Sequence, residues 1–300
     1  MLVVKASKKI PKDGQAALDA AVKYEKKMAK LILDLFKKAQ KLSAKKLEGF
    51  SEGDWERLTK ADEPVLTSLE SLYLDVATTS AQTLTISLPE SFVVKSPTAI
   101  KFAQESAATL IKNISSEAQA SIRQIIANAQ IQGITGRNQA IQIRQFIGLT
   151  QRQVNSIANL TNSLEGISAM PRGAQIMRLA QLGESFPLSQ VRNRVLSDQA
   201  IQRIVSDYAN RQLRYRATMI ARTETMMAAN AGREMTWLEL QKQGLVPDSA
   251  VRVWYVTPDE RTCSQCQALH LTETKLSESA QIPPLHPQCR CVILLEYKRG

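Results

Sequence analysis

The residues whose type and spacing best fit a chemical role lie near the end of the sequence. Cys263 and Cys266 form a Cys-x2-Cys pair, and His286 and Cys289 form a His-x2-Cys pair further along. Each pair lets two side chains of one tight turn reach the same tetrahedral ion. The pattern predicts a structural zinc site made by these four residues, in which Cys291 can replace His286 or Cys289.

The alternative is a small apolar module with reduced, buried cysteines. All four cysteines of the chain fall in this one segment, whereas a disulfide scaffold is shorter and uses cysteine more densely. Either interpretation gives the segment a structural role, because a site closed by four protein ligands leaves no position for water.

The sequence lacks the usual signatures of an enzyme. It contains no H-E-x-x-H, no phosphate-binding G-x-x-x-x-G-K-[ST], no G-x-G-x-x-G and no G-x-S-x-G. The zinc deaminase pattern, which needs H-x-E before P-C-x-x-C, is also missing. Because only two histidines are present, little remains for general acid–base work. We therefore expect neither catalysis nor a small-molecule substrate.

A second candidate motif is Arg222-Thr-Glu224, in a segment that should form a long helix. Residues two apart do not face each other on a helix, so we expect Arg222 and Glu224 to anchor different neighbours, such as the cysteine segment. The alternative, a nucleotide-handling site, lacks supporting partners.

The charge of the chain is positive and uneven. The net charge is +11, with +8 in residues 1–50, −5 in residues 51–100 and +7 in residues 101–240. Such an excess attracts polyanions, although a solvated surface and arginine–carboxylate contacts at subunit interfaces are alternatives. The candidates for contact with nucleic acid are Lys23, Lys26, Lys27, Lys30, Lys37, Arg203, Arg211 and Arg214.

Apolar periodicity and helix-boundary residues indicate a mainly α protein, a long helical body with a small C-terminal α+β Cys/His module. Three regions are expected: a basic helical region 1–95, a helical body 96–247 and a β-containing module 248–300. The expected helices are 14–47, 62–83, 97–132, 137–147, 150–165, 171–182 and 198–243, and the expected strands are 251–255 and 291–297.

The first helix carries an apolar stripe in which Glu25 occupies one position. An isolated helix of this kind is marginal in water, so the stripe must be covered. We expect the acidic segment 51–75 to fold back and cover it, which leaves the lysine face free for DNA or an acidic partner. Docking on another protein or on a second copy is the alternative.

Several pieces of the C-terminal half together resemble the phage head-morphogenesis family, the Mu F-like minor head proteins. They are Arg216 to Thr225, Ala229 to Gly232, Trp254, Asp259-Glu-Arg261 with the Cys263 pair, Leu269-His270, and Pro283 to Cys291. The resemblance spans roughly residues 145–295. It assigns Arg222, Glu224, Asp259 and Arg261 to a structural motif, and it departs at Leu271, where glycine is frequent.

The resemblance implies a minor head protein that joins the procapsid near the portal, with the portal protein and the major capsid or scaffold proteins as partners. Contact with packaged DNA is consistent with it. The alternatives are a non-specific DNA-binding accessory protein of packaging or ejection, and a remnant of a phage effector or toxin fusion. With no secretory signal and no apolar run of membrane-spanning length, we expect the host cytoplasm during assembly and then the virion.

Overall fold

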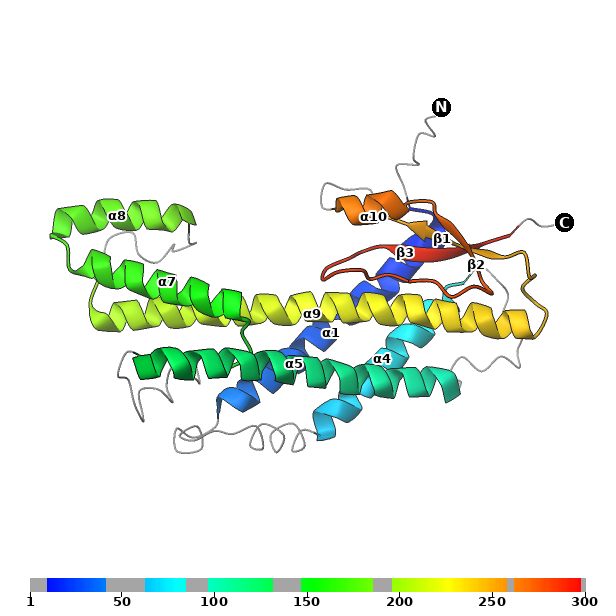
Figure 1. Cartoon of the computed structure of the whole chain (residues 1–300), viewed down its shortest axis with the longest axis horizontal. Helices are drawn as coiled ribbons and strands as arrows, with labels where there is room; N and C mark the ends of the chain where they lie inside the picture. The colour runs from blue at the N-terminus through cyan, green and yellow to red at the C-terminus, as the bar shows by residue number, and fades with distance from the viewer. Residues whose placement is uncertain are drawn as a thin grey trace, which may run out of the picture. The chain divides into compact units, whose positions relative to one another are not determined.

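The computed structural model describes residues 10–41, 63–84, 97–131, 147–185, 196–257 and 262–297. Helices dominate these residues, and a small sheet stands near the end of the chain (Figure 1). The fold is mainly α with a small C-terminal antiparallel sheet and a Cys/His cluster, as the sequence predicted. The elements are α1 (Lys12–Gln40), α4 (Glu63–Gln82), α5 (Pro97–Ile131), α7 (Gln151–Ser168), α8 (Arg172–Ser185), α9 (Asp198–Lys242), β1 (Val251–Tyr255), α10 (Ser264–Leu269), β2 (Glu273–Lys275) and β3 (Val292–Glu296).

Local sequence signals explain where the regular elements begin and end. Thr150 caps α7 in a capping box, in which its side chain accepts from the Gln153 amide and the Gln153 side chain accepts from the Thr150 amide. Gly244 follows α9 with a φ of 72°, a left-handed conformation that suits glycine after a helix end. The predicted helix 137–147 and the segment 85–95 lie outside the described residues, apart from Ile147, which is in a turn.

The contacts divide the chain into two compact units made of separate segments. Unit 1 comprises residues 1–33, 62–111 and 217–300, and unit 2 comprises residues 34–61 and 112–216. Long helices supply residues to both units, so the units do not coincide with sequential regions. The division into regions 1–95, 96–247 and 248–300 stays a prediction about chain organisation.

In unit 1, α4 and α9 approach each other closely at a glycine. A Cβ atom added to Gly232 would lie 2.3 Å from the backbone oxygen of Ala77. On α1, Met28 and Ile32 are fully buried, so the chain itself covers this part of the apolar stripe. The Tyr24 hydroxyl of α1 lies 3.0 Å from the Thr79 hydroxyl of α4, which places these two helices in contact.

The sheet has the order β2-β1-β3 and is antiparallel throughout. Figure 1 shows it beside the C-terminal part of α9. On one face, Arg252 reaches α9 and bonds both carboxylate oxygens of Glu234 at 2.7 and 2.9 Å. The other face contacts the start of α1, where a Cβ on Gly14 would lie 3.2 Å from Val292. Each face of the small sheet therefore contacts a helix.

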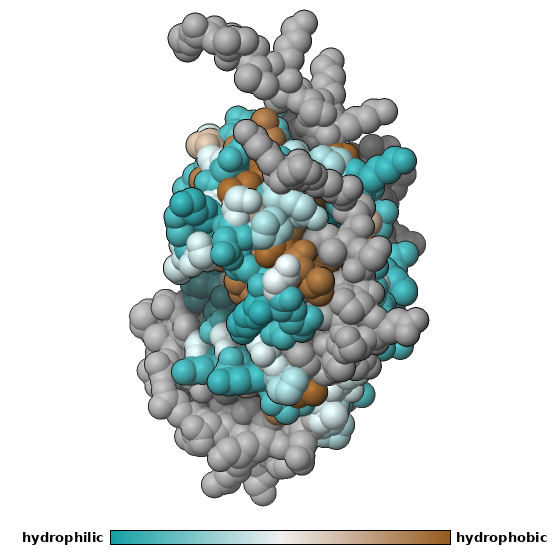
Figure 2. Space-filling view, turned by 90° about the vertical axis from the view of Figure 1, so that its right-hand side faces the viewer, coloured by the Kyte–Doolittle hydropathy of each residue, from teal (hydrophilic) through white to brown (hydrophobic). Residues whose placement is uncertain are grey.

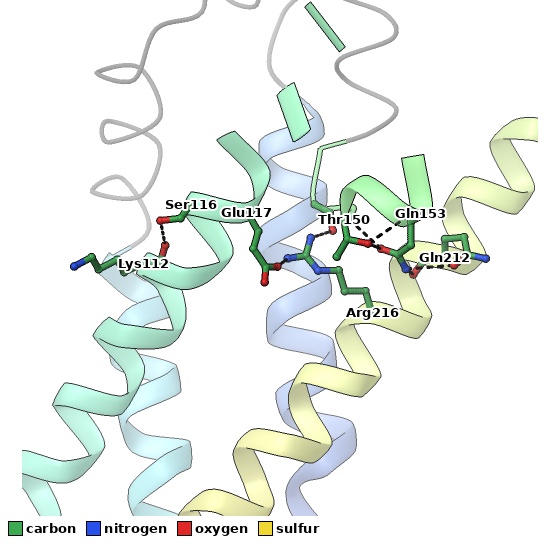
Figure 3. Close-up of polar contacts among 8 residues, drawn as sticks. Lys112, Ser116, Glu117, Thr150, Gln153, Gln212 and Arg216 are labelled. Carbon is green, nitrogen blue, oxygen red and sulfur yellow. Dashed lines mark hydrogen bonds and ion pairs between the residues drawn. The ribbon is translucent and has the colours of Figure 1, made fainter. Parts of the chain in front are cut away.

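Unit 2 is organised around a buried arginine. Arg216 of α9 donates to the Glu117 carboxylate of α5 and to the Gly148 carbonyl (Figure 3). The ring of Phe36 lies 5.3 Å from its guanidinium carbon. Burial lowers the pKa of Arg216, and the neighbouring Glu117 opposes this shift. Arg216 thus joins three segments of the unit and is not available for phosphate.

The visible surface of the described residues is mixed in character. Figure 2 shows hydrophobic residues in small groups between hydrophilic ones. Such groups are ordinary on the surface of folded proteins. Within the described ranges, none of the helices combines the length and the apolar character that crossing a membrane requires.

Candidate metal centre

The first pair of candidate ligands lies at the beginning of α10. Cys263 is the N-cap residue, and its sulfur accepts a hydrogen bond from the Cys266 amide at 3.4 Å. Cys266 follows in the first turn and is buried. A cap and the residue three positions later point to the same side of the helix start. The short helix therefore aims both sulfurs at one point.

The second pair lies in the turn that precedes β3. The Cys289 amide donates to the His286 carbonyl at 3.1 Å, which closes the turn, and Gln288 within it has a φ of 63°. His286 Nδ1 lies 2.9 Å from the Pro287 carbonyl oxygen. Because a carbonyl only accepts, Nδ1 is the donor in this contact, and Nε2 is the ring nitrogen that faces the cysteine sulfurs. In its neutral form the imidazole can therefore offer Nε2 as a ligand atom for a metal.

The two pairs meet within metal-binding distance. His286 Nε2 lies 3.2 Å from the sulfurs of both Cys263 and Cys266, and the sulfurs of Cys266 and Cys289 are 3.8 Å apart. A tetrahedral zinc ion with the usual bond lengths separates two sulfurs by about 3.8 Å and a sulfur from a nitrogen by about 3.6 Å. All four cysteines are free thiols. The donor set and its spacing are compatible with zinc.

Cys291 is a fifth candidate donor. It forms a close group with Cys266 and Cys289, whereas Cys263, Cys266 and His286 form another, so that Cys266 belongs to both. A four-coordinate ion needs only four of these five side chains. The geometry leaves open whether Cys291 is the spare side chain or replaces His286 or Cys289.

The thiols differ in their acidity even without a metal. A hydrogen bond from the Cys291 thiol lowers the pKa of Cys289 to about 5, despite an opposing effect of burial. Burial raises the pKa of Cys266 to about 12. Cys289 thus favours the thiolate form, whereas a metal bound by Cys266 must displace the proton of that thiol.

Arg222 and Glu224 contact different neighbours. Arg222 of α9 pairs with Glu25 of α1 through its Nε at 3.2 Å and its Nη2 at 2.9 Å, and it also donates to Gln288 at 3.4 Å. Glu224 accepts a hydrogen bond of 2.6 Å from Tyr73 of α4. Arg222, Gln288 and the cluster residues line one pocket of about 240 Å³.

Some predicted site residues lie apart from the cluster or outside the described residues. His270 ends α10, and its ring packs against Tyr255 with a centroid separation of 5.9 Å. It belongs to neither group of candidate ligands. Asp259 and Arg261 lie outside the described residues.

The predicted basic residues are at the surface and divide between the units. Four lysines of α1 belong to unit 1, whereas Lys37 and the three arginines belong to unit 2. The guanidinium of Arg211 lies 5.8 Å from the ring centre of Tyr208. The exposed members are Lys23, Lys26, Lys27, Lys30, Lys37, Arg203, Arg211 and Arg214.

The part of the chain that contains α9 and the Cys/His cluster is also similar in sequence to a known protein family. Residues 189–294 match the family model of phage Mu protein F like proteins. This match confirms the resemblance for the C-terminal third of the chain and supports a phage head-morphogenesis family. It begins later than the predicted span 145–295, so α7 and its Thr150 cap lie outside the matched residues.

The phage Mu F-like match is the comparison on which the function class rests. Comparison with curated proteins and with solved structures gives no significant match. The match covers α9, β1, β2, the first three residues of β3 and both pairs of candidate ligands. Phage head morphogenesis is therefore the function class that the family relationship supports.

Proposed function

We propose that this protein is a minor head protein of a tailed phage that enters the procapsid near the portal and has no catalytic role. The observation that carries the proposal is the Mu F-like match, which falls on the residues that build α9 and the Cys/His cluster. Portal, capsid or scaffold proteins are the partners that this family suggests, and the virion is the corresponding location.

Zinc is part of the proposal because the side chains fit it. Cys263, Cys266 and His286 form one group of possible donors, and Cys266, Cys289 and Cys291 form the other. We assign the ion to Cys263, Cys266, His286 and Cys289, with Cys291 as the substitute ligand. Bound zinc supplies a cross-link between the start of α10 and the turn before β3. Small modules gain much of their folding free energy from such a cross-link. The cluster would thereby stabilise a module whose sheet has only three strands.

The test of the proposal is the protein content of particles made by a phage that encodes the chain. Mass spectrometry of purified procapsids and virions should detect the full-length protein at a constant ratio to the portal protein. A phage that encodes the protein without residues 1–50 should incorporate less of this shortened protein into its particles, because α1 and its lysines contribute to targeting. Absence of the wild-type protein from both particles would contradict the proposal.

A second candidate function is non-specific DNA binding during packaging or ejection. The observation that favours it is the row of exposed lysines on α1, on the side opposite its buried stripe. Lysine side chains bind phosphates as point charges without reading sequence. This activity is compatible with the assembly role. It becomes the main function only if the protein stays outside particles.

A further inference from the structure

The turn that presents His286 and Cys289 is held from outside the cluster by α9. The Gln288 amide donates to the Thr223 hydroxyl at 3.0 Å, and the Gln288 side chain accepts from Arg222 at 3.4 Å. Gln288 lies between the two candidate ligands and has a left-handed backbone. Two successive residues of α9 therefore fix the conformation of this turn.

The same helix also holds the chain just after the turn. Asn230 is fully buried, and its side-chain nitrogen donates to the Cys291 carbonyl at 3.2 Å. Its side-chain oxygen accepts from the Ile293 amide at 3.1 Å. One side chain thus pairs with the backbone on either side of Val292. Side chains of α9 therefore form hydrogen bonds with the backbone of Gln288, Cys291 and Ile293, on both sides of Cys289.

Arg222 connects this turn to α1. Its other nitrogens bind both oxygens of Glu25, and the side chain of Glu25 is only 13% exposed. Glu25 lies between Ala21 and Met28, which are buried against the rest of the chain. A carboxylate in this position needs a charged partner, because an unpaired buried charge is costly. The packing of α1 is therefore favourable only when Arg222 is placed to form its ion pair with Glu25.

We propose that metal occupancy of the Cys/His cluster and the docking of α1 on α9 are linked through Arg222, with Glu25 and Gln288 as positioning residues for the second pair of ligands. This inference rests on the metal site of the proposed function. Both events require the same arrangement of Arg222, so each favours the other, and linkage makes the effect reciprocal. The metal would thereby hold the lysine-bearing helix in place.

The first test measures zinc affinity of the full-length protein by competition with a chromophoric chelator. Glu25→Gln and Gln288→Asn should each weaken zinc binding about five-fold, a usual size for coupling between sites. Asparagine tolerates the left-handed backbone of position 288 but is too short to keep the contact with Arg222. Tyr24→Phe is the matched control: it removes the hydrogen bond from α1 to Thr79 and should leave the affinity unchanged.

The second test measures amide hydrogen exchange in α1 with zinc bound and after chelation. Removal of zinc should accelerate exchange around Glu25 in the wild type, and this difference should shrink in Glu25→Gln. Equal exchange in α1 with and without zinc, or wild-type affinity in Glu25→Gln, would overturn the linkage while leaving the metal site intact. A wild-type protein that takes up no zinc would overturn the metal site and the linkage together.

Discussion

The carboxylate of Glu224 shows how α9 places ionisable side chains in a low-dielectric environment. It directly follows Arg222 and Thr223, which contact Gln288, and it accepts its hydrogen bond from Tyr73, which is fully buried. Burial raises the pKa of Glu224 from its ordinary value, and the Tyr73 hydrogen bond only partly opposes this. The folded protein therefore binds this proton more tightly than the unfolded chain does.

This pKa shift predicts a pH dependence of stability. Because the folded-state pKa is the higher one, the stabilising contribution is complete below the ordinary pKa of glutamate and is lost as pH rises through the raised pKa. Glu224→Gln keeps an oxygen for Tyr73 and removes the charge. Relative to the wild type, its free energy of unfolding should become more positive from pH 5 to pH 8 in urea titrations, so that the variant gains relative stability as pH rises.

The control for this experiment is Glu239→Gln, at a half-exposed position of the same helix. It should change stability little at either pH, because exposed ion pairs contribute little. A Glu224→Gln variant whose stability difference stayed constant with pH would show that the buried carboxylate does not titrate as expected.

At the scale of elements, the crossing of α4 and α9 depends on Gly232. Alanine has the higher helix propensity by about 1 kcal/mol, but a Cβ here would meet the backbone of Ala77 at 2.3 Å. Backbone cannot move aside as a flexible side chain can. Gly232→Ala should therefore destabilise the protein by about 1–3 kcal/mol, a usual cost of overpacking, in chemical denaturation.

Gly166 in α7 is the matched control, since an added Cβ would meet nothing within 4 Å. There the propensity gain acts alone, and Gly166→Ala should stabilise by about 0.5–1 kcal/mol. Equal effects of the two substitutions would contradict the close helix crossing.

Most elements could be predicted from the sequence, and the exceptions have a physical reason. The long helices and both five-residue strands follow from apolar periodicity and from boundary residues such as Thr150 and Gly244. α10 and β2 were not predicted, because six and three residues are too short to show a period. Cys263 was predicted as a ligand, but its role as the N-cap of α10 was not.

The candidate site likewise has a part that the sequence predicted and a part that it did not. The spacing of the two pairs predicted that cysteines and His286 lie close together, and they form two groups of possible metal donors that share Cys266. That four of them bind zinc stays a prediction. The contacts of Arg222 with Glu25 and Gln288 could not be predicted, because Glu25 and Arg222 are 197 residues apart in the sequence. Two sequence signals pointed toward it. The Arg222-Thr-Glu224 motif was expected to anchor different neighbours, and Glu25 occupied a position within an apolar stripe, which its ion pair with Arg222 explains.

At the scale of the whole molecule, the positive charge predicts salt-dependent binding of nucleic acid. Double-stranded DNA should bind without sequence preference, and the affinity should fall steeply with salt because phosphate contacts release counterions. Reversing Lys26, Lys27 and Lys30 to glutamate should weaken binding and flatten the salt dependence in a titration monitored by fluorescence anisotropy.

The matched control reverses three exposed lysines on other elements, Lys101, Lys112 and Lys275, and so gives the same change in net charge. It should weaken binding less than the change on α1. If both triple variants lost the same affinity, net charge and not the lysine face of α1 would explain the binding. Affinity independent of salt would contradict the electrostatic account altogether.

The metal content of the purified full-length protein tests the central claim most directly. Elemental analysis should find about one zinc per chain, as a site with four ligands requires. Cys263→Ser should lose the metal and destabilise the C-terminal module, whereas His270→Ala should retain it, because His270 lies outside the ligand groups. A wild-type protein that is free of metal and fully folded, or a Cys263→Ser variant that keeps its zinc, would contradict the account.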